Sequence, residues 1–543
     1  MCTSSSHCKV FQASQQQHIV TMAGYRHSFA LSKAEVDAAT PPGTVQLIKH
    51  HGNVGDEVVW FPKPADDPVD PLNWSLTRRV LILLSVSLYS FVANFAAADV
   101  APALPVLAYT FHPPRPFSSL TRLIAVNVLM LGVSNLFWVP LGNVLGRRPV
   151  LIAATLILTL STMWCGLASS FDSLLAARVI QGIGGGAADA VAPDVVGDIF
   201  FLHQRGRAMA VYTIFLALGS MVGSTTGGYI AGSQGWPYVS WVGVALSGFS
   251  FVCILLLVPE TLFDRPATAS VDPQGVHAET TEKGPTTAAH LETTSHPKSF
   301  TFGMSLVHFV YRGGLLKQLL RPYCGLLFPG VWLVMLLYGG LVGGIVTMST
   351  VGPQIVSAPP YLWGINSGLI NVGGVVGTII GAAWTYVLAD RRIQMKAKRH
   401  ANGFSEPEDR LPAMFPSLVL ATTGMWVYGF CADSTTPAAW VGLQFGMGML
   451  SFALMQIPSI GFNYIIDSYT AISGDCFVAI VSFRGVISFA WTFFVGEWVT
   501  DRGAAEPFGI FGMLMGLFSL LAIAQWLWGK RTRIATAHWL PEK

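Results

Sequence analysis

Charged residues are scarce in this 543-residue chain, and their scarcity excludes most soluble folds. Asp, Glu, Lys and Arg together make up 11% of the residues, whereas 52% are hydrophobic. One water-soluble core cannot hide so much apolar surface, so the composition places the chain in a lipid bilayer.

Features of metal sites, disulfide frameworks and nucleotide-binding sites are also missing. The seven cysteines are scattered without paired spacings, so they indicate neither disulfides nor a metal site. The glycine run GIGGGAADA lies inside an apolar stretch and does not follow a strand, so it is not a phosphate-binding loop. We expect no enzymatic activity, no cofactor, no metal and no nucleic-acid partner. The energy source should be an ion gradient.

Long apolar runs dominate what is present. Windows of roughly 20 mostly apolar residues are long enough to cross a bilayer as helices. They predict an all-α membrane protein with about twelve spans, near 79–106, 120–140, 150–168, 174–196, 207–230, 237–258, 325–349, 365–388, 414–432, 437–460, 475–498 and 507–528.

The positive charges are sorted to one side of this arrangement. With the N-terminus in the cytosol, all but five of the 32 lysines and arginines fall on the cytosolic side. The exceptions are Arg115, Arg122 and Arg502 outside and Arg178 and Arg484 within spans. Lys and Arg near span ends resist translocation. Arg147 and Arg148, in the stretch VPLGNVLGRRPVLI, therefore hold the turn after span 2 in the cytosol.

The chain divides into five predicted parts. Residues 1–77 are polar, lack a cleavable signal pattern, and are expected to form a disordered cytosolic tail. Residues 78–258 and 325–528 each hold six spans, and the Pro-, Thr- and charge-rich stretch 259–324 is typical of a cytosolic linker. Residues 529–543 form a second tail.

The basic turn after span 2 has a counterpart after span 8, where Asp390 and Arg391 follow an apolar run. Such a repeat predicts two pseudo-symmetric six-helix bundles with a site at the midplane between them.

Two glycine series support the repeat. Each lies on nearly one helix face, where missing side chains let backbones approach closely. We interpret spans 5 and 8 as the sliding contact between the halves, although glycine is also common in membrane helices generally. The residues are Gly219, Gly223 and Gly227 in span 5 and Gly373, Gly377 and Gly381 in span 8.

Several short segments resemble the major facilitator superfamily, within it the fungal twelve-span drug:proton antiporter family, in the branch that includes polyamine and histidinol permeases. The resemblance covers about 68–530. It is carried by DPLNWS, GRRPVLI, RVIQGIGGG, GDIFFLHQRGRAMAVY, PETLFD, APPY and EPEDRLP. It implies the major facilitator fold and transport by alternating access. In such proteins spans 1, 4, 7 and 10 line the cavity, which makes Asn94, Asp189, Trp332, Tyr338 and Gln444 candidates for substrate contact.

Charged side chains inside spans need a partner or a function, because each costs roughly 2.5 kcal/mol or more near the bilayer centre. Asp189 lies mid-span, where Pro193 leaves its carbonyl without a helical donor; it is either a substrate or proton site or a structural hydrogen-bond partner. Arg484 should have a carboxylate or several carbonyls nearby and could serve transport or a structural ion pair. Arg178 is expected to extend its side chain toward the outer interface, and Asp99 to be a wet interfacial acid. At roughly 16 Å of rise, Arg178 and Asp189 cannot touch.

A charged cluster is expected on the cytosolic side. Asp198 ends span 4, where an acid opposes the helix dipole unless cations lie close by. Arg147, Arg148 and Arg205 fall on that side and, with Asp390 and Arg391 of the second half, are candidates for a cytosolic gate. Loose surface pairs of little energetic weight are the alternative.

These observations favour a proton-coupled transporter, expected as a plasma-membrane monomer, that exports a drug-like compound, toxin or secondary metabolite. Uptake of polyamine-like cations is the nearest alternative, because an acid such as Asp189 suits cationic cargo. A third possibility is a receptor on a transporter fold that binds a ligand without moving it.

Overall fold

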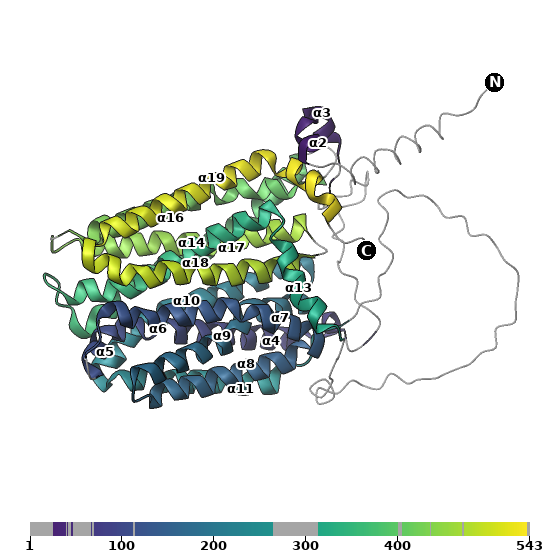
Figure 1. The fold of residues 1–543 in the computed structure, drawn as a ribbon. Helices are drawn as coiled ribbons and strands as arrows, with labels where there is room; N and C mark the ends of the chain where they lie inside the picture. The colour runs from purple at the N-terminus through teal and green to yellow at the C-terminus, as the bar shows by residue number, and fades with distance from the viewer. Residues whose placement is uncertain are drawn as a thin grey trace, which may run out of the picture.

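A computed structural model describes residues 25–39, 41, 45–46, 67, 70–111, 114–263, 313–399, 404–434, 436–469 and 472–539. Long helices run side by side in two groups, one from each half of the sequence (Figure 1). The N-terminal half contains α4 (Leu76–Ala98), η2 (Ala101–Ala103), α5 (Leu104–Thr110), α6 (Phe117–Val133), α7 (Asn135–Leu145), α8 (Arg147–Leu167), α9 (Phe171–Ile199), α10 (Leu202–Gln234) and α11 (Trp236–Leu257). The C-terminal half contains α14 (Pro329–Ser357), η3 (Gly364–Asn371), α15 (Val372–Arg399), η4 (Pro407–Met414), α16 (Phe415–Ala432), α17 (Trp440–Ser468), α18 (Ser473–Arg502) and α19 (Ala505–Thr536).

Every predicted span corresponds to one helix or to two or three consecutive helices. Eleven of these, within the described residues, are long and apolar enough to cross a membrane. The remaining crossing is α9, whose 29 residues include Arg178, Asp189 and Asp194. It carries charged side chains along its length, and it contacts α4, α6 and α8 on its sides. Together the twelve crossings form an all-α membrane fold of two six-helix bundles.

Two spans of the N-terminal half are interrupted where the sequence disfavours a continuous helix. The first breaks after Ala98 into η2 and α5, which both begin next to a proline (Pro102 and Pro105). The second divides at Ser134. There the Asn135 amide donates to the carbonyls of Leu131 (2.9 Å) and Gly132 (3.2 Å), so a side chain satisfies carbonyls at the end of α6.

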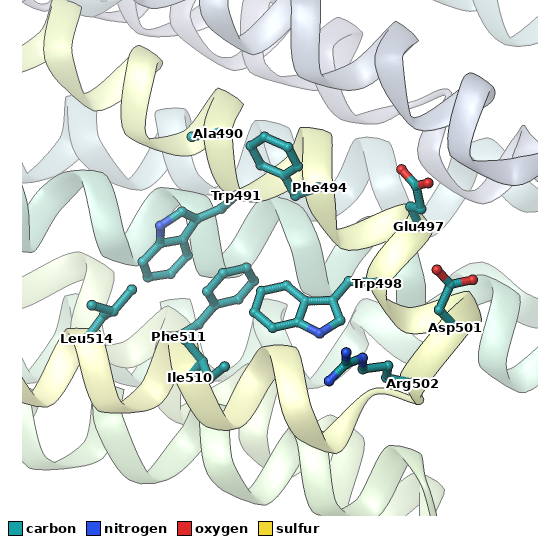
Figure 2. Close-up of a pocket in the computed structure, with 10 residues that line it drawn as sticks. All are labelled: Ala490, Trp491, Phe494, Glu497, Trp498, Asp501, Arg502, Ile510, Phe511 and Leu514. Carbon is teal, nitrogen blue, oxygen red and sulfur yellow. The ribbon is translucent and has the colours of Figure 1, made fainter.

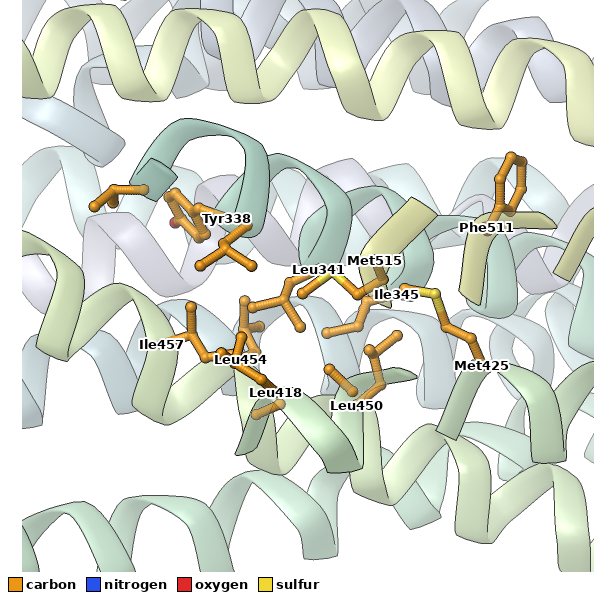
Figure 3. Packing of buried hydrophobic residues seen from close by; sticks show 14 of the residues in the cluster. Tyr338, Leu341, Ile345, Leu418, Met425, Leu450, Leu454, Ile457, Phe511 and Met515 are labelled. Carbon is orange, nitrogen blue, oxygen red and sulfur yellow. The ribbon is translucent and has the colours of Figure 1, made fainter. Parts of the chain in front are cut away.

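Each half has its own apolar core. One cluster is built almost entirely from the C-terminal half, and Figure 3 shows Leu341, Leu418, Leu450 and Leu454 meeting in its interior. Two further clusters belong to the N-terminal half, one of which also takes in Val478 of α18. Separate cores suit two bodies that move against each other.

The two glycine series pack within the halves, so their assignment to the contact between the halves is wrong. Added Cβ atoms at Gly219, Gly223 and Gly227 would meet the backbone of α4 at Phe91, Phe95 and Asp99. Those at Gly373, Gly377 and Gly381 would meet α17 at Gln444, Gly448 and Phe452. A smooth helix face permits close approach to any neighbour, and its spacing does not say which one.

Spans 5 and 8 do meet across the halves, but through other residues. A Cβ atom on Gly368 of η3 would lie 2.4 Å from the Thr225 carbonyl of α10, and one on Gly374 of α15 would lie 2.4 Å from the Met221 sulfur. The contact between these spans is therefore confirmed, and only the helix face that makes it differs from the expectation.

A second close contact between the halves joins α6 and α18. A Cβ atom on Gly132 would lie 2.7 Å from the Cα of Gly485, and one on Gly485 would lie 2.8 Å from the Cα of Gly132. A side chain at either position would push backbone against backbone, which no rotamer change relieves. Spans 2 and 11 therefore touch through a pair of glycines.

Two short helices lie in the segment for which the sequence predicts disorder. They are α2 (Tyr25–Ala30) and α3 (Lys33–Ala38), the latter closed by a capping box between Ser32 and Glu35. They rest against the end of α19 (Figure 1), where Arg531 donates to the carbonyl of Phe29 at 2.8 Å.

A two-residue strand β1 (Val45–Gln46) pairs antiparallel with β2 (Phe404–Ser405). Three short helices complete the described chain: η1 (Pro71–Asn73), η6 (Ala537–Trp539) and α13 (Leu315–Gly325), the last within the predicted linker.

Candidate functional site

An ion pair joins the two halves deep inside the structure. Arg484 of α18 donates through Nη2 to Oδ2 of Asp189 on α9. The two side chains are 3% and 1% exposed. Because removing either partner would leave an uncompensated buried charge, such a pair resists separation. The prediction that Arg484 has a carboxylate nearby is confirmed.

Tyr338 of α14 holds the arginine from a second side. The Nη1 atom of Arg484 donates to the Tyr338 hydroxyl at 2.9 Å, and the guanidinium carbon lies 5.0 Å from the centre of the tyrosine ring. Phe462 meets that ring edge-on at 5.6 Å. The arginine is therefore held by its own half even without Asp189.

The carboxylate lies among polar groups of its own half. Asn94 of α4 donates to the carbonyl of Ser90 at 3.0 Å, and its side chain interacts with Asp189. The Tyr212 hydroxyl of α10 donates to the carbonyl of Ala188, next to the acid. Sequence reasoning missed Tyr212 and also Tyr89, which donates to the Gly184 carbonyl at 2.6 Å; a tyrosine inside an apolar span is the only signal for either.

Two atoms of the ion pair have spare hydrogen-bonding capacity. Among the described residues, no partner of normal geometry is present for Oδ1 of Asp189 or for Nε of Arg484. A buried polar atom is normally satisfied. The site can therefore accept a proton or a cargo hydrogen bond on one side and donate one on the other.

Trp332 and Gln444 are not part of this group, and their selection as cavity residues stays a prediction. The Trp332 indole donates to the Leu326 carbonyl at 2.7 Å and the side chain is 44% exposed. Gln444 is near the opposite end and donates to the Leu369 carbonyl at 3.4 Å. The family resemblance indicates which spans line a cavity, but it does not say which face of each span does so.

A second buried ion pair lies within the N-terminal half, and it corrects two expectations. Arg178 is 1% exposed and does not reach the interface, and Asp99 is 2% exposed and not wet. Their closest charged atoms are 3.6 Å apart. Arg178 also donates to the carbonyls of Ala96 (2.6 Å) and Ala97 (2.8 Å) and to Gln181 (2.7 Å).

A charged cluster gathers around Arg147, at the junction of α7 and α8. The end of the helices that holds Arg147, Arg148 and Arg205 is called the basic end below. The Arg147 guanidinium lies 2.8 Å from Asp198 and 3.9 Å from Asp194, and Arg205 interacts with Asp194 as well. Arg148 donates to the Leu255 carbonyl at 2.9 Å. All of these residues belong to the N-terminal half. The side chains of Asp390 and Arg391, the predicted members from the other half, lie outside the described residues.

Glu260 anchors this cluster and was not singled out as a site residue, although it lies in the PETLFD segment. Its carboxylate accepts from the backbone N–H groups of Arg147 (2.9 Å) and Arg148 (3.2 Å). It thereby caps the first turn of α8 and complements the helix dipole. Gly146 makes room for it: its φ is +96°, and a Cβ there would lie 2.4 Å from the carboxylate.

The fold and the site together define a polytopic membrane transporter, in which a buried ion pair joins two helical bundles. Residues 83–473 match the family model described as Major Facilitator Superfamily, and the chain belongs to that superfamily.

Known relatives are similar over most of their length. Protein HOL1 of Saccharomyces cerevisiae is 24% identical over 89% of this chain and 91% of its own. Efflux pump radE of Floropilus chiversii is 23% identical over 79% and 76%. The crystal structure of a D-xylose-proton symporter superimposes with a TM-score of 0.56 at 16% identity, covering 82% of this chain and 97% of that one, which supports the fold.

Proposed function

We propose that this chain is a secondary active transporter that exports a small amphipathic organic compound in exchange for protons. The observation that carries the proposal is the buried Asp189–Arg484 pair, which joins the two halves. In this proposal the basic end faces the cytosol, the membrane is the plasma membrane, and residues 78–258 and 325–528 move as two bodies. Export also agrees with the printed name of one relative, an efflux pump.

The charge balance of the site favours an uncharged or zwitterionic cargo over a polyamine. An unpaired acid would attract a cation, but Asp189 is paired with Arg484 and Asp99 with Arg178. Each of these two buried pairs therefore carries no net charge. A polycation entering this site would meet the Arg484 guanidinium beside the acid, and bringing like charges together costs free energy in a region of low dielectric.

Protonation of Asp189 supplies the coupling step. A proton bound at the carboxylate neutralises it, which removes its attraction to Arg484 while Tyr338 still holds the arginine. The halves can then separate without pulling opposite charges apart. Cargo that hydrogen-bonds to the ionised carboxylate competes with the proton, so the two bind in turn. A proton moving down 100 mV contributes about 2.3 kcal/mol to each cycle.

The test uses purified protein in lipid vesicles loaded with acidic buffer and diluted into neutral buffer. Radiolabelled chloramphenicol, a neutral aromatic amphiphile, should accumulate as protons leave. Asp189→Asn should still exchange the label at equilibrium but should not accumulate it. Asp172→Asn, which changes an exposed acid at the start of α9, should behave like the unmodified protein.

Labelled spermidine serves as the competing cargo. Accumulation of spermidine that requires Asp189, with no movement of chloramphenicol, would replace export of an amphiphile by polyamine transport. Binding of chloramphenicol without any flux would favour a receptor.

A further inference from the structure

A cleft of about 500 Å³ opens between α18 and α19 at the end opposite the basic end. Its apolar wall is aromatic: the rings of Trp491 and Phe511 stack at 4.3 Å, and Trp498 meets Phe511 edge-on at 6.1 Å. Figure 2 shows these rings following one another along the cleft, with the carboxylates of Glu497 and Asp501 at one side and the Arg502 guanidinium beside Trp498. The cleft is separate from the site of the inter-half ion pair, because Glu497 lies about 20 Å along α18 from Arg484.

The positions of the Glu497 and Asp501 carboxylates are electrostatically unfavourable when no cation is bound between them. Glu497 and Asp501 are four residues apart and share a helix face, where like charges repel. Both lie in the last two turns of α18, where the helix dipole also disfavours negative charge. Within the described residues, neither acid has an ion-pair partner at 4 Å or less. A cation between them would remove both penalties.

The neighbouring groups indicate what else the ligand carries. Among the residues that the structure describes, Arg502 has one ion pair, an exposed one with Glu506 at 3.2 Å, and such pairs are worth under about 1 kcal/mol. Its guanidinium is thus available to a phosphate, which it can bind through two N–H groups. The Trp498 ring suits an alkylammonium group. The walls formed by Trp491, Phe511 and Leu514 suit a hydrocarbon chain.

We propose that this cleft binds a zwitterionic phospholipid. The ammonium of the headgroup lies against Glu497, Asp501 and the Trp498 ring, the phosphate pairs with Arg502, and one acyl chain follows the aromatic wall. The position agrees with this occupant, because the charged groups are in the terminal turns of α18, where headgroups meet a membrane helix, and the rings extend toward the bilayer interior.

The experiment measures which lipids remain bound to the full chain. Purified protein is equilibrated with equal amounts of phosphatidylcholine and phosphatidylglycerol of matched chains, washed in detergent, and weighed by native mass spectrometry. Phosphatidylcholine should exceed phosphatidylglycerol about fivefold, the ratio that corresponds to ~1 kcal/mol for a cation at an exposed aromatic site. Equal retention of the two lipids by the unmodified protein would overturn the proposal without any variant.

Variants assign the preference to the cleft. The double variant Glu497→Gln/Asp501→Asn should bring the ratio to about one, and Arg502→Gln should lower retention of both lipids. Asp172→Asn removes an exposed acid at the same end of the molecule but outside the cleft, and it should leave the ratio unchanged. A ratio that survives the double variant, or that falls equally in the control, contradicts the assignment.

Two further readouts distinguish a bound lipid from a soluble cation and from the transport cycle. Lysophosphatidylcholine should displace the retained lipid, whereas tetramethylammonium alone should not; displacement by tetramethylammonium at equal concentration would show a site for soluble cations instead. Proton-driven transport should persist in the double variant, because Asp189 is unaffected. Failure of the lipid proposal and failure of the proposed export are therefore distinguishable.

Discussion

Two of the buried ion pairs, Asp189–Arg484 and Asp99–Arg178, have the same chemistry and nearly the same burial, but they differ in what they connect. Asp189 and Arg484 belong to different halves, whereas Asp99 and Arg178 both belong to the N-terminal half. Arg178 is further held by three carbonyls and an amide oxygen, while Arg484 has only Tyr338 besides its acid among the described residues. A pair within one body can stabilise that body permanently. In the proposed transport cycle, a pair between two bodies must break when they separate, so it would control the movement.

Removal of the acid from the inter-half pair should have the largest effect. Asp189→Asn leaves Arg484 buried without a counter-charge, and breaking a buried pair this way costs about 3–5 kcal/mol. We expect a lower melting temperature in a fixed detergent together with loss of proton-driven accumulation. Normal accumulation by a correctly folded Asp189→Asn protein would contradict the role given to this pair.

The same change in the intra-half pair should cost less and should spare the coupling. In Asp99→Asn, Arg178 keeps four acceptors, so the loss should be about 1–3 kcal/mol. Melting and transport are measured side by side with Asp189→Asn. If Asp99→Asn abolishes proton-driven accumulation while Asp189→Asn preserves it, the two pairs have been assigned the wrong roles.

The contact between Gly132 and Gly485, next to Arg484, allows the inter-half ion pair to be weakened without changing a charge. Gly485→Ala places a methyl group against the backbone of α6, and overpacking of this kind costs about 1–3 kcal/mol. It should also weaken the neighbouring pair by holding α18 away from α6, which lowers the transport rate. Gly509→Ala in α19, where nothing lies within 4 Å of an added Cβ, is the control and should be neutral or slightly stabilising.

The smallest effect is expected for a carboxylate that acts within one half only. Glu260→Gln weakens the cap on α8 and should cost about 1 kcal/mol of stability. The proton dependence of transport should remain, because Glu260 acts on the cluster around Arg147 and not on the inter-half pair. A changed coupling ratio in this variant would show that the basic-end cluster takes part in proton exchange.

Sequence reasoning located the helices well because bilayer thickness and apolar composition determine a span almost alone. The breaks at Ala98 and Ser134 were missed, since they depend on local prolines and on the Asn135 side chain. The helices α2 and α3 were missed because a short amphipathic segment becomes ordered only through its contacts with α19.

The candidate site was predicted in part. The cost of burying charge singled out Asp189 and Arg484 from the sequence alone, but it could not pair them, because their 295 positions of separation carry no distance information. Glycine spacing identified smooth helix faces but assigned them to the wrong neighbours. Nothing in the sequence around Tyr212 or Glu260 marks either residue as part of a site. Only the folded structure shows that Tyr212 binds the Ala188 carbonyl and that Glu260 binds backbone N–H groups at the start of α8.

The most direct test of the central claim is a double-mutant cycle on the inter-half pair. The melting temperatures of the unmodified protein, Asp189→Asn, Arg484→Gln and the double variant are measured in one detergent. If the two side chains interact as described, the double variant should be destabilised by clearly less than the sum of the single changes, since neither charge is then left alone. Strictly additive effects would contradict an ion pair between the halves.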